Sequence, residues 1–96
     1  MDAYACQLLQ TLREARQAVQ AELALRARLR SVDLVPLGLL RRSTGEFAYQ
    51  AVRLVDLMQD HNADSALIQE AEELCAFFRD AKARIGSMLG PGRVGH

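Results

Sequence analysis

The sequence has few aromatic residues, no tryptophan and a single lysine. Aromatic side chains make up 5% of its 96 residues, so any core must be built mainly from leucine, alanine and valine. A core of this kind suits helices that pack closely side by side. The composition is dominated by alanine, leucine, arginine, glutamate and glutamine, which are strong helix formers. The composition therefore predicts an all-α protein.

Cysteine and long apolar runs are also scarce. Cys6 and Cys75 form no CxxC motif and have no metal-ligand spacing to the histidines, so we expect no metal and no cofactor. No apolar run approaches the ~20 residues that a membrane helix needs. The polar residues that follow Asp2 do not fit a signal peptide. We therefore expect a protein of the reducing cytoplasm with no membrane span.

The charges cancel overall but are unevenly distributed. Residues 1–42 carry seven basic and four acidic groups (7 − 4 = +3), and residues 43–96 carry five basic and eight acidic groups (5 − 8 = −3). Oppositely charged regions attract each other within a chain or between chains. A net charge near zero also gives little protection against association. The charge distribution thus favours a protein that has a partner.

Residues 3–31 are predicted to form one long helix, because no glycine or proline interrupts their helical spacing. The apolar stripe of its first half is Leu8, Leu12, Ala15 and Val19. If this stripe continued along the helix, it would place two charged residues, Glu22 and Arg26, in the core. We therefore expect the apolar face to move, in the second half of the helix, to Leu25, Leu29 and Val32, while Leu23 continues the first stripe.

Residues 32–42, with the sequence VDLVPLGLLRR, are predicted to be an apolar connection. Pro36 and Gly38 interrupt the helical pattern here. The segment contains too many apolar residues for a solvated loop. Two interpretations remain open: a short helical turn over the end of the bundle, or an exposed docking patch flanked by Arg41 and Arg42.

Residues 43–88 are predicted to form an antiparallel helical hairpin. Ser43 and Glu46 match a capping box, which would start a helix that runs to about residue 61. Asn62 suits a left-handed helix cap, and Asp64 suits the next N-cap. The third helix, about 65–88, has the four–three apolar spacing of a coiled coil. Its stripe is Leu67, Ala71, Leu74, Phe78, Ala81, Ile85 and Met88.

Together these elements predict a single domain over residues 1–88 and a flexible tail over 89–96. The long N-terminal helix packs on the hairpin and overhangs it, because a helix from 43 to 61 is shorter than one from 3 to 31. The apolar arc of the third helix is wide enough to need neighbours on two sides. We therefore expect oligomerisation to complete the small helical bundle, as a homodimer or as an obligate heteromer.

No cluster of residues is typical of an enzyme. His61 and His96 lack a cysteine or serine at nucleophile-pair spacing. Asp60, His61 and Asp64 converge on one turn, where capping and solvation are commoner roles than metal binding. We expect a non-catalytic protein–protein interaction module, such as a small helical adaptor, a chaperone-like protein or a subunit of a larger complex.

Two sets of site residues follow from these interpretations. The predicted partner-binding residues are Leu25, Leu29, Val32, Leu37, Leu39, Leu40 and Phe77. The alternative function is that of a nucleic-acid-binding helical protein, which would use the arginine-rich face of residues 13–42. Its anion contacts would be Arg26, Arg28, Arg30, Arg41 and Arg42. Against the alternative, no aromatic residue alternates with these arginines to stack on bases.

Overall fold

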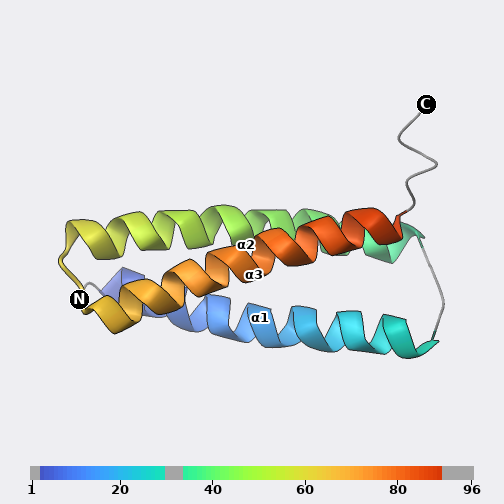
Figure 1. The fold of residues 1–96 in the computed structure, drawn as a ribbon, viewed down its shortest axis with the longest axis horizontal. Coiled ribbons are helices and arrows are strands. Elements are labelled where there is room, and N and C mark those ends of the chain that lie inside the picture. The colour runs from blue at the N-terminus through green and yellow to red at the C-terminus, as the bar shows by residue number, and fades with distance from the viewer. Residues whose placement is uncertain (1–2, 30–33, 90–96) are drawn as a thin grey trace.

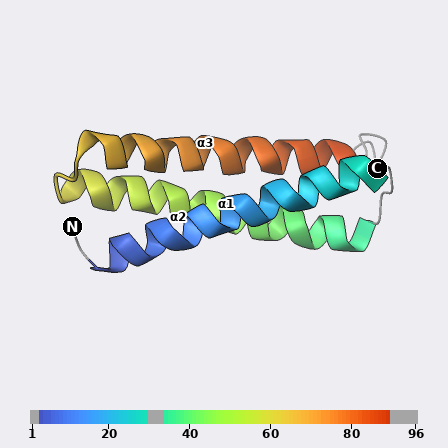
Figure 2. The ribbon, with the colours of Figure 1, turned by 90° about the horizontal axis from the view of Figure 1, so that it is seen from below.

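A computed structural model describes residues 3–29 and 34–89, and within these ranges the chain forms three α-helices and no strand. The helices are α1 (Ala3–Leu29), α2 (Leu34–Asp60) and α3 (Ser65–Met88). α2 and α3 form an antiparallel hairpin, and α1 packs along it in the direction of α3 (Figure 1). Seen from the α1 side, α1 crosses the hairpin at an angle (Figure 2). The predicted all-α bundle, with an N-terminal helix packed on a hairpin, is confirmed.

The turn between α2 and α3 follows from its local sequence. Asn62 has a φ of 54°, in the left-handed region that asparagine tolerates better than most residues. The amides of Asn62 and Ala63 donate to the carbonyls of Gln59 (3.2 Å) and Met58 (2.9 Å), which is a Schellman motif. Asp64 occupies the N-cap position of α3, but its side chain makes no cap hydrogen bond. The turn therefore closes the hairpin mainly through backbone hydrogen bonds.

The start of α2 corrects the sequence prediction. α2 begins at Leu34 and not at Ser43, so residues 34–42 are helical and form no connection. Pro36 is the third residue of the helix. An amide at this position has no intrahelical acceptor, so the missing amide hydrogen of proline removes no hydrogen bond. Ser43 is an exposed residue of the helix interior, so it does not begin a capping box. The neighbouring Thr44 is buried, and its hydroxyl donates to the carbonyl of Leu40 at 2.7 Å.

The earlier start also removes the predicted overhang of the first helix. α1 and α2 contain 27 residues each, and α3 contains 24. Helices of such similar length can cover one another from end to end. The second half of α1 therefore does not extend past a shorter neighbour.

The core lies between the three helices and contains residues from each of them. Its buried hydrophobic residues are Ala5, Leu9, Leu12, Ala15, Val19, Leu23, Leu37, Ala51, Leu54, Met58, Ala71, Leu74, Cys75, Phe78, Ala81 and Ile85. Only small or aliphatic side chains come from α1, whereas α3 contributes the one aromatic ring in this set. The expected core of leucine, alanine and valine is thus found, with Phe78 as its largest member.

In its second half α1 continues the core stripe to Leu23, as expected, while the predicted second apolar face stays a prediction, because Val32 and the side chain of Leu29 lie outside the described residues. Leu23 is buried, whereas Leu25 is 46% exposed. Arg26 lies on the inner side, with 17% of its side chain exposed. The hydrocarbon stem of an arginine can cover apolar surface at such a position, but the Nε atom of Arg26 is buried and has no hydrogen-bond partner among the described residues. Its Nη2 lies 3.5 Å from the Oε2 atom of Glu22, four residues earlier.

A bidentate ion pair connects α1 to α3. The Nε and Nη2 atoms of Arg13 each donate to an oxygen of Glu70 at 2.6 Å. The hydrogen bond from Arg13 lowers the pKa of Glu70 below its ordinary value of 4.5. One turn further along α1, the guanidinium of Arg16 lies 5.2 Å from the ring centre of Phe77. These contacts fix the position of α1 on the hairpin.

Replacing Glu70 with glutamine is expected to lower the free energy of unfolding by about 0.2–1 kcal/mol at neutral pH, the range for solvent-screened pairs. The pKa of Glu70 is lowered in the folded state. The contribution of the pair is therefore present above the pKa of the unfolded chain and disappears as the pH falls through the folded pKa. Urea unfolding of both proteins at neutral and at acidic pH measures this difference. Glu73→Gln is the control, since Glu73 is exposed and forms no ion pair within the described residues. A difference that persisted in acid would contradict the assignment.

Candidate functional site

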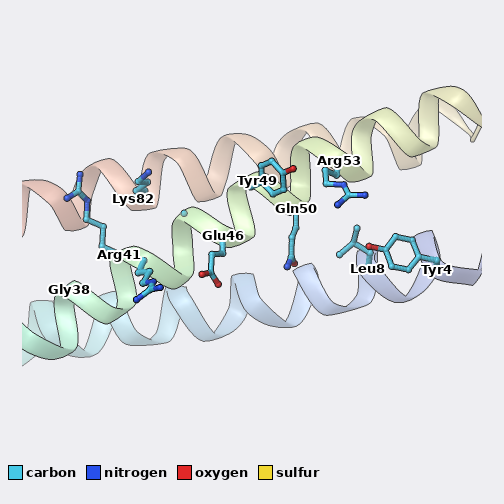
Figure 3. A pocket seen from close by; sticks show the side chains of 11 residues that line it. Tyr4, Leu8, Gly38, Arg41, Glu46, Tyr49, Gln50, Arg53 and Lys82 are labelled. Atoms are coloured by element: carbon cyan, nitrogen blue, oxygen red, sulfur yellow. The ribbon is translucent and has the colours of Figure 1, made fainter.

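A groove of about 750 Å³ lies along the outer face of α2 (Figure 3). α1 contributes Tyr4 and Leu8 at one end, and α3 contributes Lys82 near the other end. The remaining lining residues belong to α2 and are Gly38, Arg41, Arg42, Gly45, Glu46, Tyr49, Gln50 and Arg53. The groove therefore exists only once all three helices have packed together.

Two glycines of α2 make this face hollow. Gly38 and Gly45 are seven residues apart, which places them on the same side of the helix two turns apart. A methyl group added at Gly38 would meet no atom within 4 Å, whereas one at Gly45 would lie 3.4 Å from the Nζ atom of Lys82. The helix backbone is thus open to a ligand at Gly38, whereas the Lys82 side chain lies over Gly45.

Replacing Gly38 with alanine is expected to raise the free energy of unfolding by about 0.5–1 kcal/mol, because glycine within a helix is less favourable than alanine by this amount. The free space around Gly38 means that no neighbouring atom opposes the change. Gly45→Ala should give a smaller gain, since the end of the Lys82 side chain must move aside. Urea unfolding measures both. If Gly38→Ala destabilised the protein, residue 38 would not be in a helix.

The groove carries a surplus of positive charge. Four cationic side chains (Arg41, Arg42, Arg53 and Lys82) and one carboxylate (Glu46) line it, which gives 4 − 1 = +3. In the part of the chain that the structure describes, the ion pairs are Arg13–Glu70 and Arg26–Glu22. None of the four groove cations is therefore paired with a described carboxylate. Their charges are available to an anionic ligand.

The groove also carries exposed aromatic surface. Tyr49 is 66% exposed and Tyr4 is 53% exposed, although both are large side chains. Figure 3 shows Tyr49 above the middle of α2 and Tyr4 beside Leu8 at the α1 end. Tyrosine combines an apolar ring with a polar hydroxyl, and it is enriched at binding surfaces for this reason. The groove can therefore bind apolar and anionic groups at the same time.

The structure divides the predicted partner-binding residues among several environments. Leu37 is fully buried, and Leu40 and Phe77 are partly buried against the core. Leu39 is 62% exposed on α2, and Leu25 is exposed on α1. Val32 and the side chain of Leu29 lie outside the described residues. Leu37 thus stabilises the fold and offers no surface to a partner.

The predicted anion contacts are also separated. Arg41 and Arg42 line the groove. Arg28 is exposed on the last turn of α1, Arg26 is mostly covered, and Arg30 lies outside the described residues. Sequence reasoning missed Tyr4, Tyr49, Arg53 and Lys82, which the fold places beside the first two arginines.

Two negative findings apply to the described residues. No group of three or more histidine, cysteine, aspartate or glutamate side chains among them could hold a metal ion. None of the three described helices has an apolar stretch long enough to cross a membrane.

Comparison with protein-family models, with curated proteins and with solved structures gives no match to this chain.

Proposed function

We propose that this chain is a non-catalytic protein-interaction module that binds an acidic segment of another protein along α2. The observation that carries the proposal is the unpaired positive charge of the groove, combined with its exposed tyrosines. Arginine presents a planar set of donors that binds carboxylates in a bidentate manner. Carboxylate side chains are therefore suitable ligands for Arg41, Arg42 and Arg53.

The shape of the groove supports a helical segment as the ligand. From Gly38 to Arg53 the groove follows α2 for about 22 Å, at a rise of 1.5 Å per residue, which is the length of about four helical turns. The bare backbone at Gly38 allows a second helix to approach α2 closely at this end of the groove. An acidic amphipathic helix would place carboxylates near the cations and apolar side chains near Tyr49 and Leu8.

A single-stranded nucleic acid is the second candidate, because Tyr49 lies between the cations and could stack on a base. Glu46 argues against this candidate. Its carboxylate lies in the same groove between Arg42 and Arg53 in the sequence, where it would repel a continuous phosphate backbone. A protein segment can avoid this repulsion by placing a neutral or basic residue opposite Glu46.

The test uses fluorescence anisotropy with three probes. These are a synthetic amphipathic helical peptide with glutamates on its polar face, the same peptide with lysines in their place, and a single-stranded oligonucleotide. We expect the glutamate peptide to bind and the lysine peptide not to bind. The double charge reversal Arg42→Glu/Arg53→Glu should weaken binding roughly tenfold or more, since like charges then face each other.

The matched control is Arg28→Glu/Arg84→Glu, which makes the same change in net charge at exposed positions that do not line the groove. Its affinity for the glutamate peptide should stay close to that of the unchanged protein. Equal weakening by both double variants would mean that the attraction is a general charge effect. Tighter binding of the oligonucleotide, abolished by the groove variant, would replace the proposal with the nucleic-acid function. Absence of binding to all three probes would overturn both.

A further inference from the structure

A second groove, of about 300 Å³, lies between α2 and α3 and is independent of the first. All of its lining residues come from these two helices, so α1 does not contribute to it. Its apolar surface is formed by Val52, Val55, Cys75 and Ala76. Val52 and Val55 pack against the core but remain partly exposed. No residue lines both grooves.

The charged residues of this second groove are arranged by sign. Asp56 lies near the end of α2 and Glu72 lies near the start of α3, so both acids are on the side of the interhelical turn. Arg79 lies two helical turns further along α3 from Glu72, away from the turn. Within the described residues, Arg79 forms no ion pair with either acid. The groove is therefore acidic on the side of the turn, where Val55 lies beside Asp56, and positive at the other end, with Cys75 and Ala76 between Glu72 and Arg79 on α3.

This order of charges is self-complementary. Glu72 precedes Cys75 by three residues, and Arg79 follows Ala76 by three residues. Consider a twofold axis that passes through the groove beside Cys75 and Ala76. It places the acidic end of the groove on one copy opposite the basic end of the groove on the other. It therefore brings Arg79 of each copy to the acidic end of the other, where Asp56 and Glu72 lie, and it places the apolar surfaces face to face. A closed twofold contact uses the same patch on both copies, so the patch must complement itself, as this arrangement of charges does.

We propose that this groove is the contact of a homodimer, in which the hairpin of a second copy packs on the uncovered side of α2 and α3. The small side chains of Ala76 and Ala83 on this side of α3 let the partner helix approach closely. The net charge of zero adds no repulsion between copies. Because the acidic-segment groove shares no residue with this contact, the dimer would leave that groove open on both copies.

The first test introduces a single thiol near the axis. In a protein with Cys6→Ser and Cys75→Ala, the added change Ala76→Cys should give a disulfide-linked dimer under mild oxidation, because the two thiols lie close to the twofold axis. The control is Ala83→Cys in the same background, another exposed alanine two turns away on α3, whose copies lie on opposite sides of the axis. We expect little cross-linking of the control. Equal cross-linking of both variants, or of the control alone, would overturn the proposed contact.

The second test uses charge reversal and its rescue. Arg79→Glu should weaken dimerisation roughly tenfold or more, because it places like charges opposite one another across the axis. Glu72→Arg should have a similar effect, and the double variant Glu72→Arg/Arg79→Glu should recover most of the loss. Sedimentation velocity across the micromolar range measures the dissociation constant, and circular dichroism checks that each variant is folded. An unchanged protein that stays monomeric throughout, or a dimer that Arg79→Glu does not weaken, would overturn the proposal.

Discussion

Replacing Phe78 with alanine is expected to lower the free energy of unfolding by about 3–5 kcal/mol, the usual loss when a buried phenylalanine is truncated. Phe78 is fully buried. Its ring centre lies 5.4 Å from that of Phe47 on α2 and 5.2 Å from that of Phe77 on α3. The substitution removes both aromatic contacts and leaves a cavity between the helices. Since a domain of this kind is stable by only about 5–15 kcal/mol, the variant should retain a small margin.

Urea unfolding followed by far-ultraviolet circular dichroism measures this loss. Tyr49→Ala is the control, because it removes an aromatic ring of similar size that is 66% exposed. The control should change the free energy of unfolding by less than about 0.5 kcal/mol, as surface substitutions usually do. If both variants lost similar stability, Phe78 would not have the buried position described above.

Replacing Leu37 with alanine is expected to lower the free energy of unfolding by about 2–5 kcal/mol. Leu37 is fully buried in the first turns of α2, within the segment that the sequence predicts to be a connection. A large loss would show that this part of the helix packs into the core. A leucine in a solvated docking patch would give almost no loss.

Leu39→Ala is the matched control for Leu37. Both leucines lie near the start of α2, but Leu39 is 62% exposed. Helix propensity favours alanine slightly over leucine at both positions, so a difference between the variants reports burial alone. We expect Leu39→Ala to stay within about 0.5 kcal/mol of the unchanged protein. A larger loss at Leu39 than at Leu37 would contradict the orientation of α2.

The sequence predicts α3 and the turn before it correctly because local chemistry determines both. The stripe from Leu67 to Met88 has an uninterrupted helical period, and α3 occupies Ser65–Met88. Asn62 tolerates the left-handed conformation that ends α2, and it adopts this conformation. Neither feature depends on contacts with the other helices.

The start of α2 could not be predicted in this way, because packing outweighs local preference there. Pro36 and Gly38 both favour an interruption of the helix. Proline in the first turn loses no hydrogen bond, however, and burial of Leu37 supplies stability that offsets the low helix propensity of glycine. The effect of a proline on a helix therefore depends on the position of the proline in that helix. This position is known only once the first residue of the helix is known.

The candidate site was predicted only in part for a related reason. Arg41 and Arg42 were identified from their sequence alone, but they were assigned to a connection. With α2 treated as one helix from residue 34, Gly38, Gly45 and Tyr49 fall on one face, and this pattern could have revealed the hollow. Tyr4 and Lys82 come from other helices, so only tertiary packing brings them to the groove.

The Schellman turn at Asn62 also has a consequence for the order of folding. It joins α2 and α3 through a short segment, so the first contacts between these helices close small loops. Closing a small loop loses little conformational entropy of the chain. Packing of α1 on α3 needs contacts between residues far apart in the chain, such as Arg13 and Glu70. The α2–α3 hairpin should therefore form early, and the contacts of α1 with α3 should form late. Substitutions in the α1 core, such as Leu12→Ala, would then accelerate unfolding more than they slow folding, and a stopped-flow chevron giving the opposite division would exclude this order.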